Sequence, residues 1–204
     1  MLKQLIALVP GLFLAGTTLA APFTISNEVA RGNCQADLYV EQDQDGGYLL
    51  VADFNDMVAE ASSSLRRDFR HCTLTYNVNL EPGYVVRRID STVQGYYTSE
   101  AGGHVIVGVE NRAVGSTHSV NRRYSFDAPG TALDINDLAG SIHRTDLPFA
   151  AQRPGATIGL NTKYTIEAVA PQGVPGETSV RLTTATAGSA HAYPICKIYV
   201  QQGS

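Results

Sequence analysis

The residues with the clearest chemical potential are three histidines that each end a Gly-Ser-x-His segment. These segments span residues 115–118, 140–143 and 188–191 and end at His118, His143 and His191. Three converging imidazoles would bind zinc and leave a fourth position open for water. The histidines are therefore the candidate metal ligands. Their unequal spacing and the ordinary loop composition of Gly-Ser favour instead three independent, solvated loop histidines.

Local catalytic motifs are absent from the sequence. It contains no His-Glu-x-x-His, no Gly-x-Ser-x-Gly elbow in a strand-to-helix context and no phosphate-binding loop. We therefore assign no catalytic and no cofactor-binding residues, and we expect no cofactor. A hydrolase stays open as an alternative, because Asp, Ser and His residues from distant loops can assemble across a fold.

Cys34, Cys72 and Cys196 are the three cysteines of the chain. In an oxidising compartment they predict one disulfide and one leftover thiol. All three pairings are open, because each cysteine lies on the apolar face of an expected strand. We expect Cys72 to pair with Cys196, in a bridge that contributes about 2–4 kcal/mol. Cys34 would then be free and would act as a small buried hydrophobe.

Residues 1–20 have the pattern of a secretory signal peptide. Lys3 precedes an apolar run from Leu5 to Leu14, and the small residues Thr18 and Ala20 stand before the expected cleavage site. Residues 21–204 would form a single secreted domain, extracellular or periplasmic. No later segment resembles a membrane span, so we expect a product that does not span the membrane after cleavage.

The charge balance of the chain is mildly acidic. It has 15 Lys and Arg against 19 Asp and Glu, a formal net charge of -4. The one basic cluster, Arg66, Arg67 and Arg70, is interrupted by Asp68 and is expected to form a solvated loop face. This balance argues against nucleic acid and anionic membranes as partners.

Most of the chain alternates between apolar and polar residues with a period of two, as strands do. Residues 72–97 predict a central β-hairpin that turns at Glu81-Pro82-Gly83. Residues 35–41 and 48–54 predict a second hairpin, and its Asp/Gly turn is favoured over a calcium loop. Further strands are expected at 104–110, 120–126, 158–166, 180–182 and 195–201.

Two segments interrupt this alternation. Residues 54–65 have apolar residues at helical spacing and predict a short helix or a coiled excursion. Residues 128–154 predict a long excursion with one helical turn at 133–138. About nine short strands with little helix predict an all-β fold, an antiparallel β-sandwich or jelly roll.

The chain resembles the family of small secreted proteins known as domain of unknown function 4360. The resemblance lies in short patches: Cys34, Asp45-Gly46 before Leu49 to Phe54, His71-Cys72, Pro82-Gly83-Tyr84, Gly95-Tyr96 and Cys196. It implies a secreted, cysteine-bridged β-domain and carries over no catalytic residue. Residues 139–154 lack the Trp-containing Cys motif of that family, so one disulfide of its pattern is missing.

Strands, turns and the missing catalytic motif favour a secreted, non-enzymatic β-sandwich module over an enzyme. Such a module would bind a cell surface, a glycan or a protein through its loops. A secreted hydrolase and a structural component of the envelope or extracellular matrix are the alternatives. An exposed aromatic platform would favour the binding module, whereas paired carboxylates or a bonded Ser/His pair would favour the hydrolase.

Overall fold

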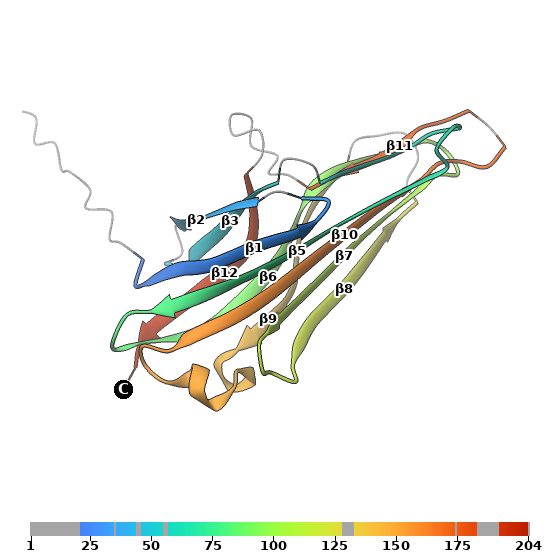
Figure 1. The fold of residues 1–204 in the computed structure, drawn as a ribbon. Coiled ribbons are helices and arrows are strands. Elements are labelled where there is room, and N and C mark those ends of the chain that lie inside the picture. Colours follow the sequence, from blue (N-terminus) through green and yellow to red (C-terminus); the bar gives the residue numbers. More distant parts are fainter. Residues whose placement is uncertain are drawn as a thin grey trace, which may run out of the picture.

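The computed structural model describes residues 21–203, except 35, 44–45, 55–56, 128–132, 174 and 183–191. The expected signal peptide, residues 1–20, lies outside the described residues. The described chain forms two antiparallel sheets packed face to face, as the sequence predicts (Figure 1). Twelve strands are described, compared with the expected number of about nine.

The five-stranded sheet has the order β1-β5-β10-β7-β8. Its strands are β1 (Phe23–Gly32), β5 (Arg67–Leu80), β10 (Thr157–Val169), β7 (His104–Ala113) and β8 (Ser119–Phe126). Figure 1 shows these five strands side by side in one layer. Four of them, β5, β7, β8 and β10, confirm strands that the sequence predicts.

The second sheet has the order β2-β3-β12-β6-β11-β4, and β9 pairs with β6. Its strands are β2 (Ala36–Gln42), β3 (Tyr48–Phe54), β12 (Ala192–Gln202), β6 (Tyr84–Ser99), β11 (Thr178–Arg181), β4 (Val58–Ala61) and β9 (Leu133–His143). β12 and β11 pair with successive parts of one edge of β6, and β9 pairs with its other edge.

The core lies between the two sheets and is built by alternation along the strands. On β5, Cys72, Leu74, Tyr76, Val78 and Leu80 all point inward and are at most 6% exposed. The residues between them are polar and face outward, as the period of a half-buried strand requires. β10 repeats the alternation, with buried residues at every second position from Ile158 to Ile166.

The predicted central hairpin is wrong in its pairing. β5 and β6 belong to different sheets, and the turn between them carries the chain from one layer to the other. The turn chemistry itself is as expected, since Tyr84 N donates to Glu81 O over 3.1 Å and Gly83 has φ 87°. Alternation fixes which side chains face the core, but it does not specify which strand lies alongside.

The second predicted hairpin is confirmed, because β2 pairs with β3 in antiparallel register. Its turn is closed by Asp43, whose N–H donates to Gly47 O over 2.8 Å and whose C=O accepts from Gly46 N. The Asp43 carboxylate forms an ion pair with Lys197 of β12. Asp43 therefore supports the plain turn that the sequence favours over a calcium loop.

Both predicted helical segments are wrong. β4 lies where a helix was expected in residues 54–65, and β9 lies where a helical turn was expected at 133–138. In the first segment, Met57, Ala59 and Ala61 are buried at every second position, so burial follows the strand period. Two 3₁₀ turns, at 144–146 and 149–152, connect β9 to β10. No helix in the described ranges is long and apolar enough to cross a membrane.

A chain of buried polar side chains links the two sheets across the core, and both of its ends lie in the second sheet. Its members are Ser91, Asn111, Thr162, Tyr76 and Cys196, all 0% exposed. Asn111 donates to Ser91 Oγ over 2.9 Å and accepts from Thr162 Oγ1 over 3.2 Å. The Tyr76 hydroxyl then contacts Thr162 Oγ1 at 3.2 Å and Cys196 Sγ at 3.6 Å. This inter-sheet polar chain satisfies groups that would be costly to bury alone.

Candidate ligand-binding groove

A shallow groove of about 350 Å³ lies on the outer face of the five-stranded sheet, over β5, β10, β7 and β8. The register aligns its side chains in three rows: Phe69, Glu167 and Ile106; then Thr165, Gly108 and Arg123; then Lys163, Glu110 and Asn121. Because alternate residues of a strand share a face, neighbouring rows lie about 7 Å apart along the strands. The rigid sheet therefore holds all three rows in fixed register.

Gly108 forms the floor of the groove. A Cβ atom at this position would lie 2.4 Å from Thr165 Oγ1, its neighbour on β10. No real Cβ atom approaches another atom so closely, so a side chain here would have to displace Thr165. The glycine keeps the centre of the groove open, in a strand where glycine is otherwise unfavourable.

Phe69 supplies an aromatic ring at one end of the groove. It is 50% exposed, although it lies within a strand and next to a well-packed core. Its ring stacks on the imidazole of His71, with 6.1 Å between centroids and 25° between planes. The stacking fixes the orientation of the ring and leaves much of it accessible to a ligand.

One ion pair lies within the groove. Arg67 Nε is 2.6 Å from Glu167 Oε1, and the Glu167 side chain is only 9% exposed. Arg67 itself is 67% exposed, so the carboxylate is enclosed while the guanidinium faces solvent. The pair neutralises Glu167 and holds it beside Phe69 and Ile106.

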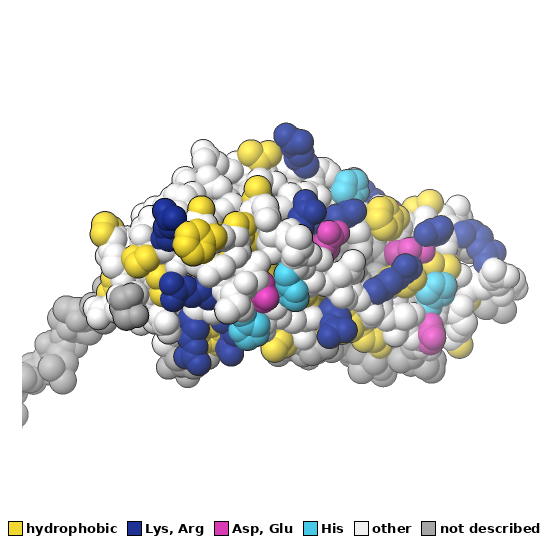
Figure 2. Space-filling model, turned by 90° about the horizontal axis from the view of Figure 1, so that it is seen from below, with side chains coloured by type: hydrophobic (Ala, Val, Ile, Leu, Met, Phe, Trp, Pro, Cys, Tyr) yellow, Lys and Arg dark blue, Asp and Glu magenta, His cyan; other side chains and the backbone are white. Residues whose placement is uncertain are grey.

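The two other cations in the middle of the groove, Arg123 and Lys163, have no ion-pair partner among the described residues. Glu110 lies opposite Lys163 in the register, yet the two do not form a salt bridge. Figure 2 shows more Lys and Arg than Asp and Glu on the side of the molecule that it presents, although the whole chain is acidic.

Together these groups are suited to a polar ligand that has an apolar face. Phe69 and Ile106 offer apolar contact, whereas Arg123, Lys163, Glu110 and Asn121 offer charges and hydrogen bonds. The sequence did not indicate this groove, because its residues come from four strands that are separated in the chain. The Arg67 cluster was expected to form a solvated loop face, but Arg67 belongs to β5 and lines the groove.

The first two Gly-Ser-x-His segments lie closer together than the sequence suggested. His118 and Ser141 line the same small depression between β8 and β9. Ser116 Oγ donates to Asp146 O over 2.5 Å, and Asp146 Oδ2 accepts from the His143 backbone N–H over 2.8 Å. These contacts tie the segments together through backbone groups.

In the part of the chain that the structure describes, no serine hydroxyl is hydrogen-bonded to an imidazole, and no group of three His, Cys, Asp or Glu could hold a metal ion. His191 lies outside the described residues. The independence of His118, His143 and His191 therefore stays a prediction.

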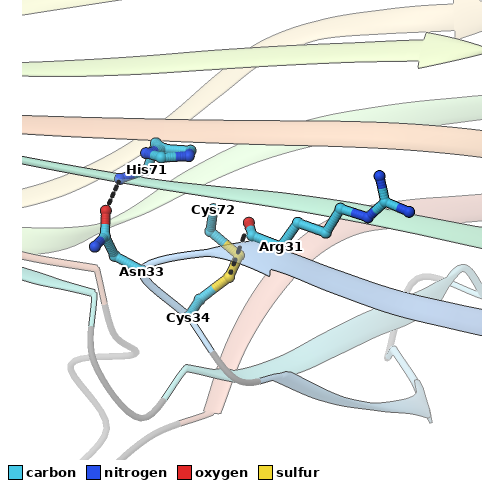
Figure 3. Close-up of a disulfide and its surroundings, with 5 residues drawn as sticks. All are labelled: Arg31, Asn33, Cys34, His71 and Cys72. Carbon is cyan, nitrogen blue, oxygen red and sulfur yellow. Dashed lines mark hydrogen bonds between the residues drawn. A yellow bond between two sulfur atoms is a disulfide. The ribbon is translucent and has the colours of Figure 1, made fainter.

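The predicted disulfide is wrong, because Cys34 pairs with Cys72 and Cys196 is the free thiol. Figure 3 shows the bridge beside Asn33, whose Oδ1 accepts a 3.2 Å hydrogen bond from His71 N. Cys196 lies beside Tyr76, which is four residues and about 13 Å along β5 from Cys72. Cys72 and Cys196 belong to different sheets, and stacked sheets lie about 10 Å apart, farther than the roughly 4.4–6.8 Å between Cα atoms that a disulfide needs.

The free thiol lies in the core and is not exposed. Burial raises the pKa of Cys196 to about 12, and contact with the Tyr76 hydroxyl does not offset this effect. Thiolate is the reactive form of cysteine, so Cys196 is chemically inert near neutral pH. The expected character of the leftover cysteine, a small buried hydrophobe, applies to Cys196 instead of Cys34.

Comparison with known proteins finds no matching family model and no matching curated protein. The resemblance to the 4360 family therefore stays a prediction. Among solved structures, the chain is similar to the family 11 carbohydrate-binding module from Clostridium thermocellum in complex with a mixed-linked tetrasaccharide. The identity is 7% and the TM-score 0.20, over 89% of this chain and 91% of the module.

Two further solved structures are similar at the same low level. The family 11 module of the cellulase Lic26A-Cel5E of Clostridium thermocellum is 8% identical, with TM-score 0.19, over 92% of this chain and 93% of the module. The tailspike protein 4 of bacteriophage CBA120 is 10% identical, with TM-score 0.24; the match covers 79% of this chain and only 18% of the tailspike. Likenesses of this size carry no functional argument.

Proposed function

We propose that the protein is a secreted, non-enzymatic β-sandwich module that binds a glycan in the groove over β5, β10, β7 and β8. The observation that carries this proposal is the exposed ring of Phe69 at the end of a polar groove. A sugar ring has an apolar face of C–H groups and a rim of hydroxyls. Phe69 and Ile106 complement the face, and the charged and amide side chains complement the rim.

The proposed binding surface is a sheet face, whereas the sequence suggested the loops. A sheet face needs no ordering on binding, so less conformational entropy is lost than with mobile loops. Secretion agrees with the Cys34–Cys72 disulfide, because such bridges persist in oxidising compartments. The groove is less suited to hydrolysis, because the Glu167 carboxylate is held in an ion pair by Arg67 and is less available as a general acid or base.

The test is isothermal titration calorimetry of the purified, disulfide-intact protein against a panel of soluble oligosaccharides. We expect Phe69→Ala to weaken binding about tenfold, because it removes the stacking surface. Phe149→Ala is the matched control, since Phe149 is 73% exposed but lies on the 3₁₀ turn outside the groove. Equal losses in both variants, or no binding by the wild type, would contradict the proposal.

A further inference from the structure

The groove contains more positive than negative side chains. Three cationic side chains, Arg67, Arg123 and Lys163, lie on this face together with two carboxylates, Glu110 and Glu167. One of these cations has a protein partner, since Arg67 pairs with Glu167. Arg122 also borders the groove, but it alternates with Arg123 on β8 and its Nε donates to Ala139 O over 3.0 Å.

Arg123 and Lys163 are therefore the cations that are available to a ligand. They flank Gly108 from the two strands on either side of β7. Neighbouring strands lie about 4.8 Å apart and the two residues are one row apart along the strands, so their backbones are about 12 Å apart across the floor. That span accommodates a sugar ring over Gly108 with a cation on each side.

The apolar and cationic parts of the groove occupy different rows. Phe69 and Ile106 lie in the row on one side of Gly108, Lys163 lies in the row on the other side, and Arg123 lies beside Gly108 itself. A ring that stacks on Phe69 would direct its far edge toward Arg123 and Lys163. A guanidinium and an ammonium at that edge favour a negatively charged substituent.

We propose that the ligand of the groove is an anionic glycan, whose carboxylate or sulfate group is held by Arg123 and Lys163. This inference rests on the proposed function and adds the charge of the ligand to it. Both substituents are oxyanions that accept hydrogen bonds from these cations in the same way. A continuous phosphate backbone is disfavoured, because the Glu110 carboxylate stands beside Lys163 without a salt bridge and would repel it.

The test compares acidic glycans with neutral partners of the same backbone. Polygalacturonate oligomers are titrated against their methyl esters, and dextran sulfate against dextran, by isothermal titration calorimetry at two salt concentrations. We expect at least one acidic member to bind about tenfold or more tightly than its neutral partner. Added salt should narrow that difference by screening the charges. Whichever pair shows the effect identifies the substituent as carboxylate or sulfate.

Two variants test the assigned residues. Arg123→Gln combined with Lys163→Gln should abolish the preference for the acidic member, so that the acidic and neutral members bind with similar affinity. Arg87→Gln is the matched control, because Arg87 is exposed on β6 of the other sheet, and it should change neither affinity. A preference that survives in the double variant would overturn the assignment.

The outcomes separate this inference from the proposed function. If acidic and neutral partners bind equally and both are weakened by Phe69→Ala, the anionic inference fails and glycan binding stands. If no glycan in either pair or in the oligosaccharide panel binds, both fail. A single-stranded DNA oligomer that binds more tightly than every acidic glycan, with loss in the double variant, would overturn the inference in favour of nucleic acid.

Discussion

The inter-sheet polar chain and the groove differ in whether their polar side chains have partners within the protein. Within the chain from Ser91 to Cys196, each polar group contacts the next, and none is exposed to solvent. In the groove, Arg123 and Lys163 have no ion-pair partner among the described residues. Unpaired polar groups cost little where water reaches them and much where it does not. The core therefore uses its polar groups for stability, and the groove leaves its own available for binding.

A third region is intermediate between these two. On the outer face of the second sheet, Arg88 Nε lies 2.8 Å from Asp90 Oδ1, which also accepts from Ser141 Oγ over 2.6 Å. The Arg88 guanidinium lies 4.4 Å from the centroid of the Tyr199 ring. Here a surface cation is engaged by protein partners on several sides. The three regions should accordingly respond differently to substitution and to pH.

The largest effect is expected in the core at alkaline pH. Burial raises the pKa of Cys196 from 9.0 to about 12, so the folded state retains a proton that the unfolded state releases. The protonated thiol therefore contributes fully to the free energy of unfolding below pH 9, and this contribution is lost as the pH rises from 9 toward 12. The slope is about 1.4 kcal/mol per pH unit in that window. Urea unfolding at pH 8, 9, 10 and 11 measures it.

Cys196→Ala is the comparison for this titration. The variant should be less stable than the wild type at pH 8, but its stability should fall less steeply between pH 9 and 10. Burial also raises the pKa of Tyr76, so part of the decline at higher pH should persist in the variant. Parallel pH curves for the two proteins would show that the thiol does not ionise on unfolding as described.

A smaller effect is expected at Asp90. Asp90→Ala removes the partner of Arg88 and of the Ser141 hydroxyl, and the Asp90 side chain is only 8% exposed. We expect a loss of about 2 kcal/mol in the free energy of unfolding. Glu110→Ala in the groove is the control and should change stability by less than about 0.5 kcal/mol. Equal effects at the two carboxylates would remove the distinction between the two outer faces.

The smallest effect on stability is expected for the groove cations. Arg123→Gln with Lys163→Gln should leave the free energy of unfolding within about 0.5 kcal/mol of the wild type, because neither side chain has an ion pair to lose. Thermal and urea unfolding at low salt measure this. A marked destabilisation would mean that these cations support the fold, and the groove would then resemble the region around Asp90.

The sequence predicted the fold class because alternation is strong along β5, β7 and β10. It wrongly predicted that β5 pairs with β6, because a turn at Pro82-Gly83 serves equally well within a sheet or between sheets. Arg87 shows a second limit. Regular alternation with Val85 and Ile89 points it inward, but a register shift opposite β12 leaves it exposed.

The disulfide and the groove were missed for a related reason. All three cysteines were expected on inward faces. An inward face does not specify which residue of another strand lies opposite, because that depends on the register and the strand order. Likewise Phe69, Gly108, Arg123 and Lys163 become neighbours only once the register of four strands is known. The available signal was weak: an aromatic residue and a glycine at outward positions of otherwise regular strands.

The crossing from β5 to β6 has a consequence for the order of folding. Because β5 does not pair with the strand that follows it, its neighbours are β1, which is made earlier, and β10, which begins only at Thr157. The five-stranded sheet therefore cannot be completed until the chain has been made as far as Val169, the last residue of β10. Proteins dominated by such distant pairings fold in about milliseconds to seconds, more slowly than proteins built from local contacts. Until β10 arrives, one edge of β5 stays open to pairing with another chain.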